Sequence, residues 1–187
     1  YGIRETKVVS ENLEKTDSYQ SEIKNTSRKE WCLKGENTLS DGEEILMTFN
    51  DGQDRMMRKS GTYNEMNLRV SNIVIQEDKD LGKYYKSNVD VYYIWNTIWD
   101  EEQSAWLLYN ESGNAYLTLV YNADDESYLW ATSREKTEGS FLTFEDGLFC
   151  ATVNGVTKYV GNVSGSGPYK GVDKEDPNIT SFTILKY

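Results

Sequence analysis

The segment SAWLLYNESGNAYLTLVYNADDESYLWATSREKTEGSFLTFEDG (Ser104–Gly147) is followed by GLFCATVNGVTKYVGNVSGSGPYKGVDKEDPNITSFTILKY (Gly147–Tyr187), which repeats its order of features. Each segment begins with a short apolar strand and a turn that contains glycine. Each continues with a strand that contains a Tyr-aliphatic pair, and each ends on a Ser-Phe strand. Tyr116 aligns with Tyr159, and SFLTF aligns with SFTIL. A period of about 40 residues with four strands indicates a β architecture built from repeated units.

The rest of the chain from Trp31 onward has the same local character. Short runs rich in β-branched and aromatic residues alternate with clusters of Gly, Asn, Asp and Ser, which are typical of turns. No segment keeps the helical repeat of about 3.6 residues over a dozen positions. The chain has only 2 prolines, which agrees with strand interiors that need every backbone N–H. The sequence therefore predicts an all-β fold.

Two turns close together mark the boundary between the repeated segments. The stretch SFLTFEDGLFCATVNGVTKYVGN contains EDG and VNGV, and both offer residues that tolerate positive φ. We expect EDG to join the second repeat to the third. We expect VNGV to form the turn that NESGN forms one repeat earlier, with Cys150 on the strand between the two turns.

A first repeat is expected within residues 31–103. Its opening EWCLKG aligns Trp31 with Trp106, and GEEILMTF aligns with GNAYLTLV. Its closing strand has two candidates. MNLRVSN would leave residues 73–103 as an insertion, whereas DVYYIWNTIW would make NLRVSNIVIQEDKDLGKYYKSN an inserted hairpin. We favour the second, because the closing strand should directly precede SAWLLYN.

On this periodicity the chain resembles β-trefoil proteins, including the lectin-like ones. The resemblance implies three four-stranded lobes (about 31–103, 104–147 and 148–187), after a polar N-terminal extension (1–30). It also implies that six strands close a barrel and six cap it as hairpins. The Gln-X-Trp motif of ricin-type trefoil lectins and the opening signature of plant Kunitz inhibitors are absent. The subfamily stays open, and another all-β barrel or sandwich is the alternative.

Composition narrows the classes of function. A formal net charge of −11 disfavours binding to nucleic acid or direct insertion into an anionic membrane. The chain has no histidine, which removes Ser-His-Asp and Cys-His catalysis and His-ligated zinc. No phosphate-binding loop or EF-hand loop is present. We expect a protein that is not an enzyme and uses no metal or cofactor, with a carboxylate-only glycosidase as a remote alternative.

Sequons and cysteines bear on the compartment. Asn-X-Ser/Thr occurs at Asn25, Asn110, Asn162 and Asn178, which favours a secreted or cell-surface glycoprotein. Cys32 and Cys150 lie far apart in the chain. They could form a disulfide with each other, one could bridge to a partner subunit, or both could remain free thiols.

One turn carries the residue types that carbohydrate recognition uses. YNADDESYLW places Asn122, Asp124 and Asp125 directly before Tyr128 and Trp130. Carboxylates can accept hydrogen bonds from vicinal hydroxyls while an aromatic ring stacks on the sugar. These five residues are the predicted carbohydrate site, and the trefoil resemblance also points to hairpin loops. The expected ligand is a glycan or a glycoprotein.

An aromatic stretch is the second candidate site, a predicted protein interface. The residues concerned are Tyr84, Tyr85, Tyr93, Trp95 and Trp99. Strand alternation sends Tyr93, Trp95 and Trp99 to one face, which is either core or an exposed platform. The alternative function is therefore a protein-interaction subunit of a surface adhesin complex, or a trefoil-type inhibitor.

Overall fold

The computed structural model describes residues 26–27, 30–33, 36–52, 54–59, 68–72, 76–78, 82–86, 89–161 and 169–187. Side chains are described for residues 31–33, 36–52, 54–58, 89–161 and 169–187. Most of the expected N-terminal extension (1–30), together with Asn25 and Asn162, therefore lies outside the described residues.

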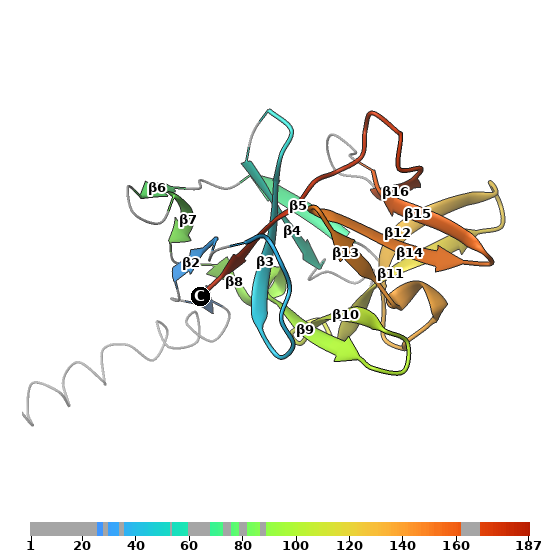
Figure 1. Cartoon of the computed structure of the whole chain (residues 1–187), viewed down its shortest axis with the longest axis horizontal. Helices are drawn as coiled ribbons and strands as arrows, with labels where there is room; N and C mark the ends of the chain where they lie inside the picture. The colour runs from blue at the N-terminus through green and yellow to red at the C-terminus, as the bar shows by residue number, and fades with distance from the viewer. Residues whose placement is uncertain are drawn as a thin grey trace, which may run out of the picture.

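The described chain is all-β, as the sequence predicts (Figure 1). An antiparallel sheet of 15 strands carries the fold, and β1 (Thr26–Ser27) and β8 (Val89–Asp90) form a separate pair. The helices within the described ranges are two short 3₁₀ turns, η1 (Val91–Tyr93) and η2 (Glu138–Ser140). No helix in these ranges is long and apolar enough to cross a membrane.

Twelve of the strands form three groups that share one pairing pattern. In each group the first strand pairs with the second, and the second pairs with the third. The first group contains β3 (Glu44–Asn50), β4 (Asp54–Lys59), β5 (Leu68–Asn72) and β9 (Trp95–Asp100). The second contains β10 (Ala105–Asn110), β11 (Ala115–Asn122), β12 (Ser127–Ser133) and β13 (Thr143–Glu145). The third contains β14 (Leu148–Val153), β15 (Val156–Val160), β16 (Tyr169–Val172) and β17 (Thr183–Lys186).

The fourth strand of each group pairs with the first strand of the next. β9 pairs with β10, β13 pairs with β14, and β17 returns to pair with β3. The first and fourth strands of one group also meet. Ile45 of β3 lies opposite Trp95 of β9, and Trp106 and Leu142 donate backbone N–H groups to each other's carbonyls at 2.8 Å. In the third group, Phe182 N–H donates to the Gly147 carbonyl at 2.7 Å.

The strand that opens the first group differs from the expectation. EWC forms β2 (Glu30–Cys32), which pairs with β17 and with β7 (Gly82–Lys86) and lies outside the three groups. The opening position belongs to β3, whose EILMTF run leads into an Asn-Asp-Gly turn. Trp31 aligned with Trp106 because both precede an apolar pair, but Trp31 packs on the outer face of β3 and β17.

The prediction that DVYYIWNTIW closes the first group is correct, but the strand is shorter than predicted. The WNTIWD part of DVYYIWNTIW forms β9, which directly precedes β10, whereas Val91–Tyr93 is the 3₁₀ turn η1. The expected inserted hairpin is shorter than predicted. β6 (Gln76–Asp78) and β7 form a hairpin, while β5 belongs to the first group because it pairs with β4.

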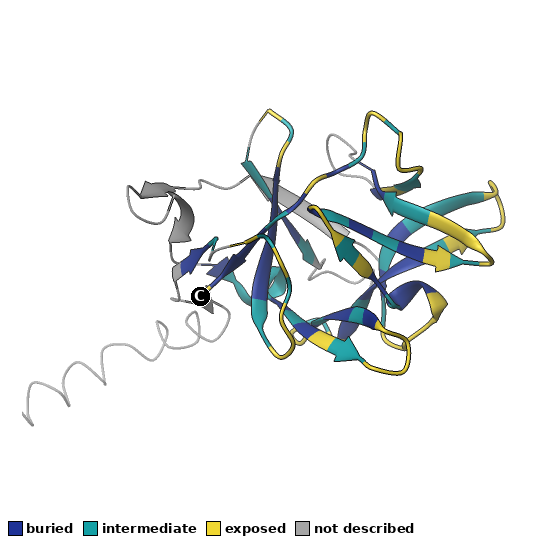
Figure 2. Ribbon diagram, in the orientation of Figure 1, coloured by how far each residue is buried: buried dark blue, intermediate teal, exposed yellow. Residues whose placement is uncertain are grey.

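The core draws on all three groups. Burial is concentrated in the strands, and the turns at their ends are exposed (Figure 2). The largest side chains of the main cluster are Trp95, Trp130, Phe149, Phe182 and Tyr169. A second cluster of Trp31, Leu46, Met56, Val89 and Leu185 covers the outer side of β3 and β17. Both faces of β3 are therefore buried, which explains why Ile45, Leu46 and Met47 follow one another without a polar residue.

The two turns predicted around Cys150 are present. Asp146 and Gly147 have φ of 52° and 81°, and they connect β13 to β14. Asn154 and Gly155 have φ of 53° and 77°, and they connect β14 to β15. Asn114, in the equivalent turn of the second group, has φ of 48°. Asn and Gly tolerate this left-handed conformation at small cost.

Gly139→Ala should destabilise the fold, because a Cβ at this position would stand 1.9 Å from the Leu119 carbonyl oxygen. Backbone must move to make room, so we expect a loss of about 2 to 3 kcal/mol in the free energy of unfolding, measured by urea titration. The control is Glu135→Ala at an exposed position nearby, expected within about 0.5 kcal/mol of wild type. Equal stability of the two variants would contradict the packing of η2 against β11.

Tyr169→Phe should stabilise the protein. The Tyr169 hydroxyl is buried and makes no hydrogen bond to any described residue, so its removal should raise the free energy of unfolding by about 1 kcal/mol. Burial also raises the pKa of Tyr169. Above about pH 10 the unfolded chain loses this proton while the folded chain keeps it, so stability falls with pH, and the variant should lose less. Tyr121→Phe, at an exposed ring, is the control. A destabilised Tyr169→Phe protein would contradict the account.

Candidate functional site

The five residues of the predicted carbohydrate site do not form one surface. Trp130 is 1% exposed, lies in the core and donates its Nε1–H to the Tyr159 carbonyl at 3.0 Å, so no ligand can stack on it. Asp124 and Asp125 are exposed in the β11–β12 turn. Asn122 and Asp125 use side-chain oxygens within that turn, where they accept hydrogen bonds from Asp124 N–H and Ser127 Oγ.

The remaining predicted residue, Tyr128, is half-buried beside other side chains. Its ring centroid lies 5.1 Å from that of Tyr121, and Lys158 Nζ lies 5.7 Å from the Tyr128 ring centroid. Lys158 in turn forms a 2.7 Å ion pair with Asp173. A lysine therefore already occupies one face of the tyrosine ring.

The predicted interface residues are also dispersed. Trp95 is 0% exposed and donates its Nε1–H to the Met57 carbonyl at 3.3 Å, so it belongs to the core. Tyr93 lies under the Arg58 guanidinium, 5.3 Å from its ring centroid, and half-buried Trp99 packs edge-on against Trp106. Tyr84 and Tyr85 lie on β7, and their side chains are outside the described residues.

The two sequons within the described ranges differ in accessibility. Asn110 is 0% exposed and donates its Nδ2–H to the Tyr92 carbonyl at 2.7 Å. A glycan on that nitrogen would break the hydrogen bond and find no room. Asn178 is exposed, so of these two residues it alone can carry a glycan on the folded chain.

The two cysteines are not bonded to each other. Cys32 is buried on β2, and Cys150 is half-exposed on β14, a strand that does not neighbour β2. Of the three alternatives left open by the sequence, the structure therefore disagrees with a disulfide between Cys32 and Cys150. Burial, and then the nearby Cys150, raise the pKa of Tyr159, whose backbone lies opposite Cys150 on β15.

A groove at the joint between the second and third groups combines aromatic and acidic side chains. We call it the Trp106 groove, and its volume is about 560 Å³. Three elements form it: β10, the end of β13 with its turn, and the segment that precedes β3. The lining residues are Glu36, Asn37, Thr38, Leu39, Trp106, Phe144, Glu145, Asp146 and Gly147.

Asn37 fixes the segment that forms one wall of the groove. Its Nδ2–H donates to the Phe182 carbonyl at 2.7 Å, and its Oδ1 accepts the Ile184 N–H at 2.8 Å. The Asn37 side chain thus bonds the backbone of β17 and of the residue before it. Leu39 follows and packs against the core, which holds the segment at both ends.

The aromatic wall is fixed by cross-strand pairs. Trp106 packs edge-on against Trp99, with ring centroids 4.8 Å apart, and its backbone is bonded to Leu142. Phe144 packs against Phe149 at 4.4 Å. Trp106 and Phe144 are both half-buried against the core. Each ring therefore packs against the core on one side and lines the groove on the other.

The acidic wall depends on the β13–β14 turn. A Cβ on Gly147 would meet Ser181 Oγ at 2.6 Å and the Phe182 carbonyl oxygen at 3.0 Å, so glycine alone allows this approach. The turn presents Glu145 and Asp146, and Glu36 lines the groove from the segment before β3. All three carboxylates are exposed, and none has an ion pair with a described residue. No Lys or Arg is among the lining residues.

This arrangement can bind hydroxyl-rich or cationic groups through carboxylates and apolar faces through two rings. Within the described ranges, no group of three or more His, Cys, Asp or Glu residues is placed to hold a metal ion. The sequence pointed to Trp106 as part of the opening strand of the second repeat and to EDG as a joint. The sequence did not predict that Glu36 lies near Trp106 and the EDG turn, because that proximity depends on the pairing of β17 with β3.

Comparison with protein-family models gives no match, and comparison with curated proteins finds no significantly similar sequence.

When the chain is expressed through a glycosylating secretory pathway, we expect glycan on Asn178 and none on Asn110. The reason is that the Asn110 amide is buried and hydrogen-bonded, whereas Asn178 is exposed. Peptide mapping by mass spectrometry, with and without an N-glycosidase, measures the occupancy of each site. A glycan on Asn110 in folded protein would contradict the structure around η1.

Proposed function

We propose that the three strand groups form a β-trefoil, with β3, β9, β10, β13, β14 and β17 as its barrel. The equivalent pairings in the three groups support this, because each fourth strand pairs with the next first strand. The contacts of Ile45 with Trp95, Trp106 with Leu142, and Phe182 with Gly147 would complete the ring. A ring without free edges stabilises repeated units that cannot bury their apolar sides alone.

We also propose that the chain is a non-catalytic, lectin-like carbohydrate-binding domain of a secreted or cell-surface glycoprotein. The observation that carries this proposal is the Trp106 groove, which two aromatic residues and three acidic residues line together. The proposed ligand is a glycan or a glycoprotein. The absence of histidine and the exposed sequon at Asn178 are further support.

The groove matches the two chemical sides of a sugar ring. The C–H face of a pyranose is apolar, and it packs well on an indole ring such as that of Trp106, which the Trp99 ring contacts edge-on. The hydroxyl edge of the sugar donates hydrogen bonds, and carboxylates accept these more strongly than neutral oxygens do. A volume of about 560 Å³ lies within the usual range for small-ligand sites.

Trp106→Ala should weaken glycan binding by about 30-fold, the loss expected when an aromatic residue at the centre of a binding site is truncated. The measurement is a glycan array on wild-type protein, followed by titration of the best ligand against each variant. Asp146→Asn and Glu145→Gln should each weaken binding by about tenfold without affecting the fold, since they are isosteric.

The matched control is Tyr121→Ala, an exposed aromatic residue outside the groove, which should bind as wild type does. Thermal unfolding of each variant separates loss of binding from loss of structure. The proposal fails if the array shows no glycan ligand. It also fails if folded Trp106→Ala protein binds with unchanged affinity.

A further inference from the structure

A second cavity, of about 480 Å³, lies on the other side of the wall that forms the Trp106 groove. Ala105 and Thr143 line this cavity, whereas their chain neighbours Trp106 and Phe144 line the groove. Successive side chains of a strand point to opposite faces. The contact between β10 and the start of β13 therefore lies between the two cavities. We call the second one the Phe141 pocket.

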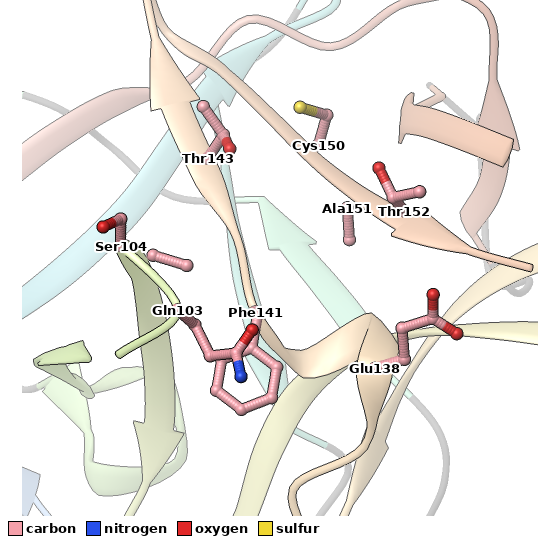
Figure 3. Close-up of a pocket in the computed structure, with 9 residues that line it drawn as sticks. Gln103, Ser104, Glu138, Phe141, Thr143, Cys150, Ala151 and Thr152 are labelled. Carbon is pink, nitrogen blue, oxygen red and sulfur yellow. The ribbon is translucent and has the colours of Figure 1, made fainter. Parts of the chain in front are cut away.

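Several separate elements supply the side chains of the Phe141 pocket (Figure 3). Gln103 comes from the β9–β10 turn, Glu138 from η2, and Phe141 from the residue after η2. Thr143 and Thr152 come from β13 and β14. The volume of the Phe141 pocket, about 480 Å³, lies within the usual range for small-molecule sites.

Some polar groups of the pocket are available to a ligand, whereas the Thr152 hydroxyl is hydrogen-bonded to that of Thr157 at 2.7 Å. Gln103 and Thr143 make no side-chain hydrogen bond to a described residue. Glu138 uses one carboxylate oxygen, Oε2, in a long 3.3 Å hydrogen bond from Asn154 N–H. The lining contains one carboxylate and no Lys or Arg. This set of an amide, hydroxyls and a single carboxylate suits a neutral ligand rich in hydroxyl groups, with the Phe141 ring beneath its apolar face.

We propose that the Phe141 pocket is a second saccharide site, specific for neutral sugar rings, and that the chain is bivalent. The choice of a saccharide as the ligand rests on the proposed function, whereas the existence of the site rests on the pocket itself. Two separate sites can hold two glycan chains at once. A bivalent chain binds a surface that displays many glycans more tightly than either site alone, and it can cross-link two such surfaces.

Cys150 provides a reporter for this pocket. Cys150 is partly exposed and lines the cavity, whereas Cys32 is 8% exposed and lies on β2. The experiment measures the rate at which iodoacetamide alkylates each cysteine, by peptide mapping, with and without methyl glycosides of neutral sugars at tens of millimolar. We expect at least one glycoside to slow alkylation of Cys150 several-fold and to leave Cys32 unaffected. Sorbitol, a polyol without a ring, should give no protection.

Two variants separate this site from the Trp106 groove. Glu138→Gln should require about tenfold more glycoside for the same protection of Cys150, because a charged acceptor is lost. Trp106→Ala should keep the protection. Protection that is lost in Trp106→Ala but kept in Glu138→Gln would overturn the second site.

The outcomes of this experiment and of the glycan titration are distinguishable. Glycan binding without protection of Cys150 by any glycoside overturns the Phe141 site and leaves the proposed function standing. Protection of Cys150 that persists in Trp106→Ala supports the Phe141 site, even if the groove itself binds nothing. Failure of both measurements overturns both proposals.

Discussion

The two backbone hydrogen bonds between Trp106 and Leu142 are the contact on which both cavities depend. β13 is only three residues long, and these bonds hold the residue before it against β10. Leu142 is 0% exposed, so its N–H and carbonyl have no access to water and need this pairing. The first and third groups make comparable contacts between their first and last strands. In the proposed trefoil, three such contacts convert a long antiparallel sheet into a ring.

The two strands that meet at this contact contribute successive residues to different cavities. Trp106 and Phe144 face the groove, while Ala105 and Thr143 face the Phe141 pocket. Two contacts hold the lining of the groove in place. Asn37 hydrogen-bonds the backbone around β17, and Trp99 packs against Trp106. Preorganised rings and carboxylates lose little entropy on binding a ligand, which favours affinity for small hydroxyl-rich molecules. The turn at Gly147 completes the acidic wall at a position where only glycine fits.

Sequence periodicity predicted the second and third strand groups well, because their turns carry Asn and Gly at positions that need positive φ. It placed the opening strand of the first group wrongly. Trp31 has the same sequence neighbourhood as Trp106, but it covers the outside of the sheet. The site residues were harder to predict. Trp130 follows acids in a turn as a sugar-binding residue would, yet it points into the core, because strand alternation alone does not say which face is buried. Glu36 reaches the groove only through long-range pairing that no local pattern reveals.

Hydrogen exchange of individual backbone amides, followed by NMR, tests the central claim most directly. If the contact between Trp106 and Leu142 closes the second group, the amides of these two residues exchange only on global unfolding. Their rates should then match those of the buried amides in β11 and β12, and the Phe182 amide should behave in the same way. Exchange of Trp106 and Leu142 at the rates of the exposed β11–β12 turn would contradict the closure, and with it the wall shared by the two cavities.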